Sequence, residues 1–226
     1  MNLTSSQKRI IERVVNAFET GSADGNYAAI AIMNDGPHNI RQITYGRSQT
    51  TEYGNLRELV ARYIAAGGRL SRPLARYADK IGSIPLADDA VFKTFLRQAG
   101  KEDPVMRQVQ DKFFDDAYFT PAKKWAEKNG FTLPLSMLVI YDSFIHSGSI
   151  LWIIRQKFPE SPPAGGGNEK AWIKAYVDAR HAWLGSHPRE VVRRTTYRTT
   201  CFKTEIKRGN WNLAMLPVTA HGVKVS

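Results

Sequence analysis

The chain is poor in cysteine and in acidic residues, and it has no uninterrupted apolar run long enough to span a membrane. Its one cysteine, Cys201, has no second cysteine with which to form an internal disulfide. Cys and His residues do not occur at the spacings typical of metal sites, so we expect neither a metal nor an organic cofactor. The most apolar stretch, residues 137–154, contains Asp142 and His146, which would face lipid in a spanning helix. We therefore expect no membrane insertion.

The shortage of acidic residues leaves a strongly basic chain. There are 32 Lys and Arg residues against 21 Asp and Glu, a formal charge of +11 over 226 residues. Such an excess favours anionic partners. One hypothesis is a nucleic-acid-binding protein whose phosphate-tracking surface lies within residues 193–208. No helix-turn-helix, RNA-recognition or zinc signature supports it, so no nucleic-acid partner is expected and the hypothesis is kept only as an alternative.

The spacing of apolar residues predicts a mainly α-helical α+β protein. Helical periodicity occurs in residues 56–64, 74–81, 90–98, 105–117, 121–128, 135–158 and 170–184. The one clear strand, Ile43 to Gly46, comes early, so the sheet is expected to be small and to form a hairpin near the N-terminus. We predict a single domain over residues 1–226 with two lobes beside a cleft. One lobe is expected at about residues 1–70 with the C-terminal segment, and the other at about residues 71–190.

The first predicted helix carries a carboxylate on its apolar face. Thr4 and Gln7 match a capping box, and apolar residues then follow at helical spacing: Ile10, Ile11, Val14, Val15 and Phe18. Glu19 lies four positions after Val15, where an apolar side chain would continue this stripe. It also lies in the last turn, close to unpaired carbonyls, because Gly21 ends the helix. Both surroundings disfavour ionisation, so we expect Glu19 to keep its proton as a general acid does.

Asp35 lies in contrasting surroundings. The segment Asn34 to Pro37 has turn chemistry, which offers backbone amides and water to the carboxylate, so we expect Asp35 to stay ionised. Two carboxyl groups whose surroundings favour opposite protonation states are typical of an acid and base pair. The plainer alternative is a solvated helix end followed by an ordinary turn.

The strand after Asp35 adds a hydroxyl and reveals a family resemblance. Glu19, Asp35-Gly36 and Ile43-Thr44-Tyr45-Gly46 resemble the catalytic segment of the chitosanases of glycoside hydrolase family 46, which belong to the lysozyme-like superfamily. The resemblance implies a lysozyme-like fold in which Glu19 is the acid, Asp35 is the base and Thr44 orients the water. It also implies inversion at the sugar carbon, for which the two carboxyl groups are about 6.5–9.5 Å apart.

Four downstream segments extend the resemblance over nearly the whole chain. They are Tyr141 to Gly148, Val177 to Arg180, and the pair Arg194 to Arg198 and Gly209 to Leu213. The family has an Asp and two Arg that support the acid, and their counterparts here are Asp142, Arg180 and Arg194. Arg193 and Arg198 remain alternatives to Arg194. The residues themselves agree in part, because Asp142 interrupts an apolar segment and a buried carboxylate needs a partner such as Arg. A purely structural salt bridge is the alternative.

The predicted function is endo-hydrolysis of β-1,4 links between amino sugars. Residues expected to bind the polysaccharide are Tyr45, Arg47, Glu52 and His146. The resemblance favours chitosan as the polymer, whereas the charge of +11 favours anionic bacterial peptidoglycan. A non-catalytic glycan-binding relative is a further alternative. We expect a monomer. Residues 1–13 lack the apolar segment of a signal peptide, so we expect secretion or cell-wall action by another route, or otherwise a cytoplasmic location.

Overall fold

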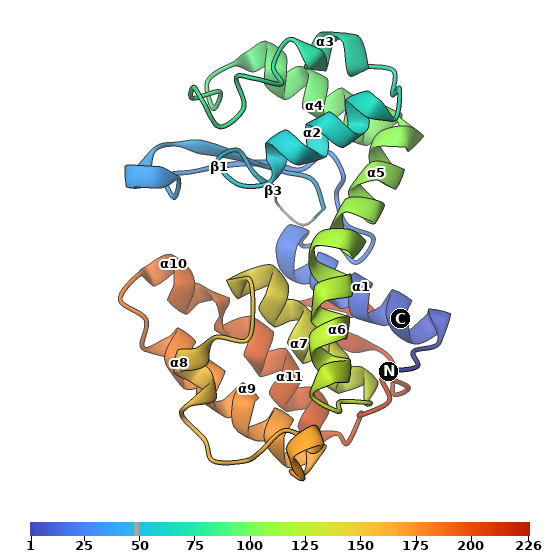
Figure 1. Cartoon of the computed structure of the whole chain (residues 1–226), viewed down its shortest axis with the longest axis vertical. Coiled ribbons are helices and arrows are strands. Elements are labelled where there is room, and N and C mark those ends of the chain that lie inside the picture. The colour runs from blue at the N-terminus through green and yellow to red at the C-terminus, as the bar shows by residue number, and fades with distance from the viewer. Residues whose placement is uncertain (48–49) are drawn as a thin grey trace. The chain divides into compact units, whose positions relative to one another are not determined.

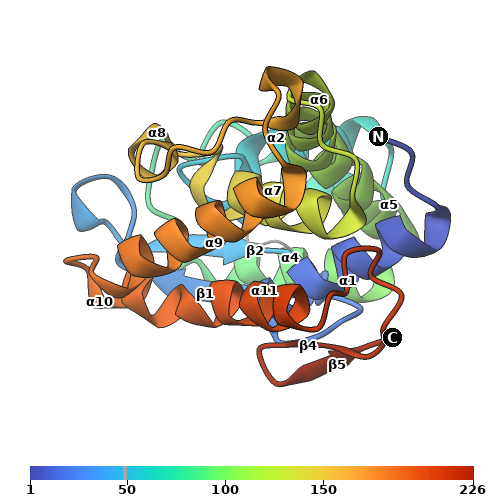
Figure 2. The same cartoon turned by 90° about the horizontal axis from the view of Figure 1, so that it is seen from below.

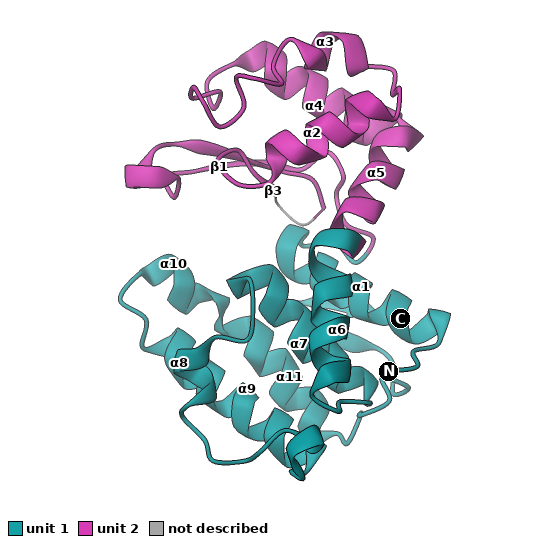
Figure 3. Ribbon diagram, viewed as in Figure 1, with its two compact units in different colours: residues 1–23, 116–226 teal, residues 24–115 magenta. Residues whose placement is uncertain are grey.

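The computed structural model describes residues 1–47 and 50–226. The chain forms two compact units: unit 1 comprises residues 1–23 and 116–226, and unit 2 comprises residues 24–115 (Figure 3). These bounds differ from the predicted lobes, because residues 24–70 belong to unit 2 with residues 71–115, and residues 116–190 belong to unit 1 with the first helix. The cause is packing, since the apolar face of the first helix is buried in the core of unit 1. None of the helices in the described ranges is long and apolar enough to cross a membrane.

Helix α1 (Ser5–Thr20) forms as its sequence predicts. Thr4 and Gln7 cap its N-terminus through a reciprocal pair of hydrogen bonds, and Gly21 ends it with a left-handed φ of 70°. The predicted apolar stripe from Ile10 to Phe18 is buried. The last turn of α1, which carries Glu19, is therefore held against the core of unit 1.

Helix α7 (Pro134–Ser147) is the central helix of unit 1 (Figures 1 and 2). The other helices and strands of the unit are α6 (Thr120–Lys128), α8 (Trp152–Arg155), α9 (Glu169–Gly185), α10 (Glu190–Arg193), α11 (Tyr197–Lys207), β4 (Val218–Ala220) and β5 (Val223–Val225). Helix α7 contacts α1, α6, α9 and α11, and every residue from Pro134 to Ser143 is buried. A helix that is buried on all sides is expected to be apolar all round, and Asp142 is its one acidic residue within that span.

Unit 2 combines a small sheet with helices. Strands β1 (Ile30–Met33), β2 (Gln42–Tyr45) and β3 (Thr50–Thr51) form an antiparallel sheet in that order, with Ala31 opposite Thr44 and Thr44 opposite Thr51. The helices are α2 (Leu56–Ala65), α3 (Ser71–Ala75), α4 (Ala90–Glu102) and α5 (Pro104–Phe114), and a short 3-10 turn, Pro37–Asn39, lies between β1 and β2. Buried aromatic and aliphatic side chains such as Tyr45, Leu59 and Phe113 form its core.

The predicted fold class is confirmed, and several element bounds differ. The expected helix pair over residues 135–158 is interrupted at Gly148, whose φ of 75° ends α7, and α8 has only four residues. Helix α3 stops at Ala75 rather than continuing to residue 81. Helix α11 and the β4–β5 hairpin were not predicted. The sequence of α11 is rich in threonine, a weak helix former, so its stability depends on its packing against α7 and α9.

Candidate active site

Glu19 meets a buried arginine at the C-terminal end of α1. The Glu19 carboxylate accepts a hydrogen bond from the Arg198 guanidinium, which α11 supplies. The side chain of Glu19 is 13% exposed and that of Arg198 is 4% exposed. This contact lies wholly within unit 1. The prediction for Glu19 considered only its place at the end of the helix and did not include the positive charge of Arg198.

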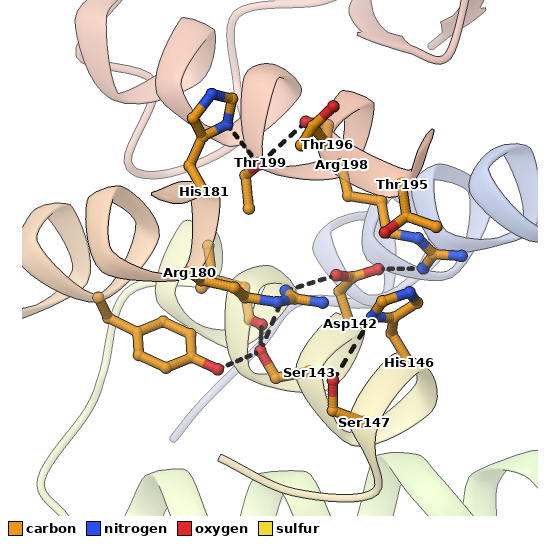
Figure 4. A network of polar contacts seen from close by, with 12 residues as sticks. Asp142, Ser143, His146, Ser147, Arg180, His181, Thr195, Thr196, Arg198 and Thr199 are labelled. Atoms are coloured by element: carbon orange, nitrogen blue, oxygen red, sulfur yellow. Dashed lines mark hydrogen bonds and ion pairs between the residues drawn. The ribbon is translucent and has the colours of Figure 1, made fainter. Parts of the chain in front are cut away.

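Arg198 is fixed by a second carboxylate and by two aromatic rings. Its Nη1 donates to Asp142 Oδ1 at 2.7 Å (Figure 4). Its guanidinium carbon lies 5.4 Å from the Phe18 ring centroid and 5.7 Å from that of Tyr197, within cation–π range. Burial lowers the pKa of Arg198, but the carboxylates of Glu19 and Asp142 raise it more, so the group stays charged. Arg198 therefore presents a permanent positive charge to Glu19.

Asp142 joins two arginines. Its Oδ2 accepts from Arg180 Nη1 at 2.7 Å, while its Oδ1 binds Arg198. The carboxylate has no exposed surface. Burial raises the pKa of Asp142, and the two guanidinium groups lower it further than burial raises it, so the pKa is below its usual value. Two carboxyl groups and two guanidinium groups thus form a connected network: Glu19, Arg198, Asp142 and Arg180.

The position of Arg194 corrects one expectation. Arg194 binds Glu190 of α10 at 2.7 Å, and both side chains are largely exposed. Arg198 occupies the place in the network that was expected for Arg194. Residues 194–196 form a 3-10 turn ahead of α11, so Arg194 and Arg198 do not share one continuous helix face. Arg193 instead donates to the backbone carbonyls of His187 and Pro188.

His146 lies one helical turn after Asp142 on α7 and borders the same network (Figure 4). Burial lowers the pKa of His146 to about 4, and the charge of Arg198 lowers it as well, while Asp142 opposes them. The imidazole is therefore neutral near pH 7. Its Nδ1 lies 3.4 Å from Ser147 Oγ. A neutral ring can accept or donate one hydrogen bond, which is compatible with the predicted contact with a sugar hydroxyl.

Asp35 belongs to unit 2, where it is exposed just after β1. Its Oδ1 accepts from Gln42 Nε2 at 2.8 Å, and Gln42 Oε1 in turn accepts from the Tyr53 backbone amide at 3.2 Å. The turn is closed by the Gly36 amide, which donates to the Ile40 carbonyl. Gln42, which sequence reasoning missed, thus orients the carboxylate. Nothing in the local sequence distinguishes it from any other polar residue of a strand.

Thr44 lies on β2, the strand expected to follow Asp35. The side chain is buried, and its hydroxyl donates to the Ala31 carbonyl of β1 at 3.1 Å. The strand register fixes this contact, because Ala31 is directly opposite Thr44.

Three residues predicted to bind substrate are instead parts of the core of unit 2. Tyr45 is fully buried and donates its hydroxyl to the Leu96 carbonyl at 2.7 Å, so it has no face on which a sugar can stack. Glu52 is 1% exposed and accepts from the amides of Ile43 and Leu86. Arg47 is 5% exposed, with its Nε 3.2 Å from Asp111 Oδ1 and its guanidinium over the Phe114 ring. Their closeness in sequence to Thr44 suggested that they bind substrate, but their side chains are buried and stabilise the core of unit 2.

Across residues 1–47 and 50–226, no cluster of three or more Cys, His, Asp or Glu side chains is arranged to hold a metal ion. The charged network of unit 1 contains two carboxyl groups, Glu19 and Asp142, and unit 2 contains the exposed carboxyl group of Asp35. Carboxyl groups paired with fixed hydrogen-bond donors can carry out proton transfer.

Comparison with known proteins agrees with this chemistry. Residues 13–217 match the profile of glycosyl hydrolase family 46. A chitosanase of Bacillus subtilis (strain 168) is 28% identical over 229 residues, which cover 93% of this chain and 80% of the relative. A mutant chitosanase from Bacillus subtilis MY002, solved in complex with 6 GlcN, has a TM-score of 0.84 at 24% identity, with 100% of each chain covered.

A third relative comes from another organism. The family 46 chitosanase of Gynuella sunshinyii, solved with chitotetraose, has a TM-score of 0.80 at 25% identity, covering 99% of this chain and 98% of that one. These structures share the mainly helical fold with a small antiparallel sheet. Because the family profile spans most of the sequence, the chain belongs to glycosyl hydrolase family 46 and is a chitosanase-like glycoside hydrolase.

Proposed function

We propose that this protein cleaves chitosan internally at its β-1,4 links, with Glu19 as the general acid. The observation that carries the proposal is the hydrogen bond from Arg198 to Glu19, which continues through Asp142 to Arg180. Such a network holds one carboxyl group at a helix end in a fixed orientation. The relatives add support, since two of them were solved with GlcN or with chitotetraose.

Arg198 has a specific part in the proposed proton transfer. When Glu19 gives its proton to the glycosidic oxygen, the carboxyl group becomes a carboxylate. The contact with the Arg198 cation is stronger to the carboxylate than to the protonated acid, so the interaction gains strength as the proton leaves. Because Arg198 is already fixed by Asp142, little reorganisation is needed during the reaction.

Asp35 is the proposed general base. The Gln42 amide occupies one side of its Oδ1, and the exposed carboxylate retains capacity to accept a proton from water. Thr44 is proposed to orient this water. Its hydroxyl proton is already donated to Ala31, so it would act towards the water as an acceptor. Attack by water on the face opposite the leaving group inverts the sugar carbon.

The uneven charge of the chain bears on the choice of polymer. Unit 1 contains 19 Lys and Arg against 10 Asp and Glu, whereas unit 2 contains 13 against 11. Unit 2, which carries Asp35, is therefore close to neutral, and the positive excess that would repel cationic chitosan belongs mainly to unit 1. The same excess favours peptidoglycan, an anionic polymer, as a second candidate substrate.

The test is release of new reducing ends from chitosan and, separately, from peptidoglycan sacculi. We expect Glu19→Gln and Asp35→Asn each to lower the rate on chitosan by about 10²–10⁴-fold, since each removes one step of proton transfer. The matched control is Asp88→Asn, because Asp88 forms an exposed ion pair with Arg41 in unit 2. It should retain the native rate.

Two outcomes would contradict the proposal. Native activity in a folded Glu19→Gln variant would remove Glu19 from the mechanism, and cleavage of sacculi alone would replace chitosan by peptidoglycan. The anomer formed first, followed by proton NMR, tests inversion. A β-linked substrate should give the α-anomer first, and initial release of the β-anomer would contradict a single displacement.

A further inference from the structure

The Ser143 hydroxyl, next to Asp142 on α7, lies at the meeting point of three hydrogen bonds (Figure 4). It donates to the Val139 carbonyl at 2.8 Å. It accepts from Tyr176 Oη at 3.0 Å and from Arg180 Nη1 at 3.2 Å. A hydroxyl group has one proton to donate and two lone pairs, so all of its hydrogen-bonding capacity is used.

Arg180 depends on this hydroxyl for its orientation. Its Nη1 is shared between Asp142 and Ser143. Its Nε and Nη2 are buried and find no hydrogen-bond partner among the described residues. A guanidinium that is bound through one nitrogen can rotate about that contact unless a second acceptor restrains it. Ser143 provides that second acceptor.

Tyr176 is itself held rigidly. Its ring lies 5.2 Å from the Trp172 ring, centroid to centroid, at an interplanar angle of 14°, and Phe158 contacts it edge-on. Both Tyr176 and Trp172 are almost completely buried. Burial raises the pKa of the Tyr176 hydroxyl, so it remains a proton donor throughout the working range of pH. The Tyr176 hydroxyl, which donates to Ser143, is therefore fixed by the packing of its ring against Trp172 and Phe158.

We propose that Ser143 and Tyr176 are positioning residues for the acid. They hold Arg180 on Asp142, and Asp142 holds Arg198 against Glu19. This inference rests on the proposed function, because it assigns a role only if Glu19 is the proton donor. Neither hydroxyl contacts Glu19 directly, so both act through the arginines.

The two hydroxyls predict different effects. Ser143→Ala removes the second acceptor of Arg180 and the partner of Tyr176. Tyr176→Phe leaves Ser143 able to accept from Arg180 and removes only one donor. Ser143→Thr retains a hydroxyl that can bond to the carbonyl four residues earlier, as threonine does elsewhere in this protein at Thr200 and Thr204. The expected order of damage is Ser143→Ala, then Tyr176→Phe, with Ser143→Thr closest to native.

The experiment measures kcat, KM and the pH–rate profile on chitosan, with rates divided by the concentration of folded protein. We expect Ser143→Ala to lower kcat by about tenfold or more with little change in KM, since the acid is misplaced while the sugar contacts remain. The alkaline limb of the profile should move to higher pH, because Arg198 then stabilises the Glu19 carboxylate less. Ser143→Thr should restore both kcat and the limb.

The matched control is Ser136→Ala. Ser136 is also fully buried on α7, and its hydroxyl has no hydrogen-bond partner among the described residues. Ser136→Ala should leave both readouts native. If Ser143→Ala shows the same kcat and pH limb as Ser136→Ala, the positioning role is overturned. If Ser143→Ala does not fold, Tyr176→Phe is measured instead. A lower kcat with a shifted alkaline limb would then support the positioning role, and native values of both would contradict it. Full activity of Glu19→Gln would instead overturn the proposed function.

Discussion

Asp142 shows how much one buried residue depends on its partners. Its carboxylate has no exposed surface and binds a different arginine through each oxygen. The two guanidinium groups are buried as well, so each charge of this cluster is compensated only by the others. The sequence indicated a buried carboxylate with an arginine partner, and the structure places two.

We expect Asp142→Asn to lower the free energy of unfolding by about 3–5 kcal/mol at neutral pH, because it leaves the arginines buried with less compensating charge. The arginines lower the pKa of Asp142, so its contribution is complete above the unfolded-state pKa of about 3.9 and is lost as the pH falls through the folded-state value. Urea unfolding of native protein and variant at neutral and at acidic pH measures the difference.

The control for this prediction is Asp88→Asn, which alters an exposed ion pair. It should change the free energy of unfolding little at any pH, because exposed pairs contribute little. A difference between native protein and Asp142→Asn that stays constant from neutral to acidic pH would contradict the role assigned to the Asp142 charge.

Glu52 acts at the scale of elements, because it joins β2 to the loop ahead of α4. Its Oε2 accepts from the Ile43 amide at 3.0 Å and its Oε1 accepts from the Leu86 amide at 2.7 Å. Glu52 directly follows the end of β3, and a polar residue at such a place in the sequence can equally well contact a ligand or bind another part of the fold. The contacts show that it serves the fold of unit 2.

We expect Glu52→Gln to lower the free energy of unfolding by about 1–3 kcal/mol, because one amide donor would then face the NH₂ group rather than an oxygen. KM for chitosan should not change. Chemical denaturation and steady-state kinetics measure the two effects. Glu58→Gln, which alters the exposed pair with Arg62 in the same unit, is the control. If Glu52→Gln raises KM for chitosan and leaves the free energy of unfolding unchanged, Glu52 contacts the sugar rather than stabilising the fold.

At the scale of the whole molecule, the charge of +11 gives a test that separates the two candidate polymers. Added salt screens interactions between exposed charges, and the Debye length falls from about 30 Å at 0.01 M to about 8 Å at 0.15 M. As the salt concentration rises, the repulsion between the protein and a cationic polymer weakens, and so does its attraction to an anionic polymer.

We therefore expect KM for chitosan to fall as salt rises from about 0.01 M to about 0.15 M, and any KM for sacculi to rise over the same range. Reducing-end assays at fixed pH measure both. Uncharged short-chain substrate of the same linkage, with its amines acetylated, is the control and should show little salt dependence. A KM for chitosan that rises with salt would show that local acidic groups, rather than the net charge, dominate binding.

The sequence by itself determined the family, the fold class and the capped helix that carries Glu19. Those features depend on local rules: Thr4 and Gln7 cap the helix, its apolar stripe repeats at the helical period, and Gly21 ends it. The order of short motifs along the chain was also visible without coordinates.

Only the tertiary structure decided which arginine supports Glu19 and which nearby polar residues are buried. Arg194 and Arg198 are four positions apart, which is about one helical turn. Arg194 lies in the 3-10 turn at residues 194–196, whereas Arg198 lies in α11. Because α11 packs against α7, Arg198 is the arginine that reaches Asp142. Tyr45 and Glu52 are likewise assigned by burial. Burial and long-range pairing arise from contacts between residues far apart in the chain, which local spacing does not encode.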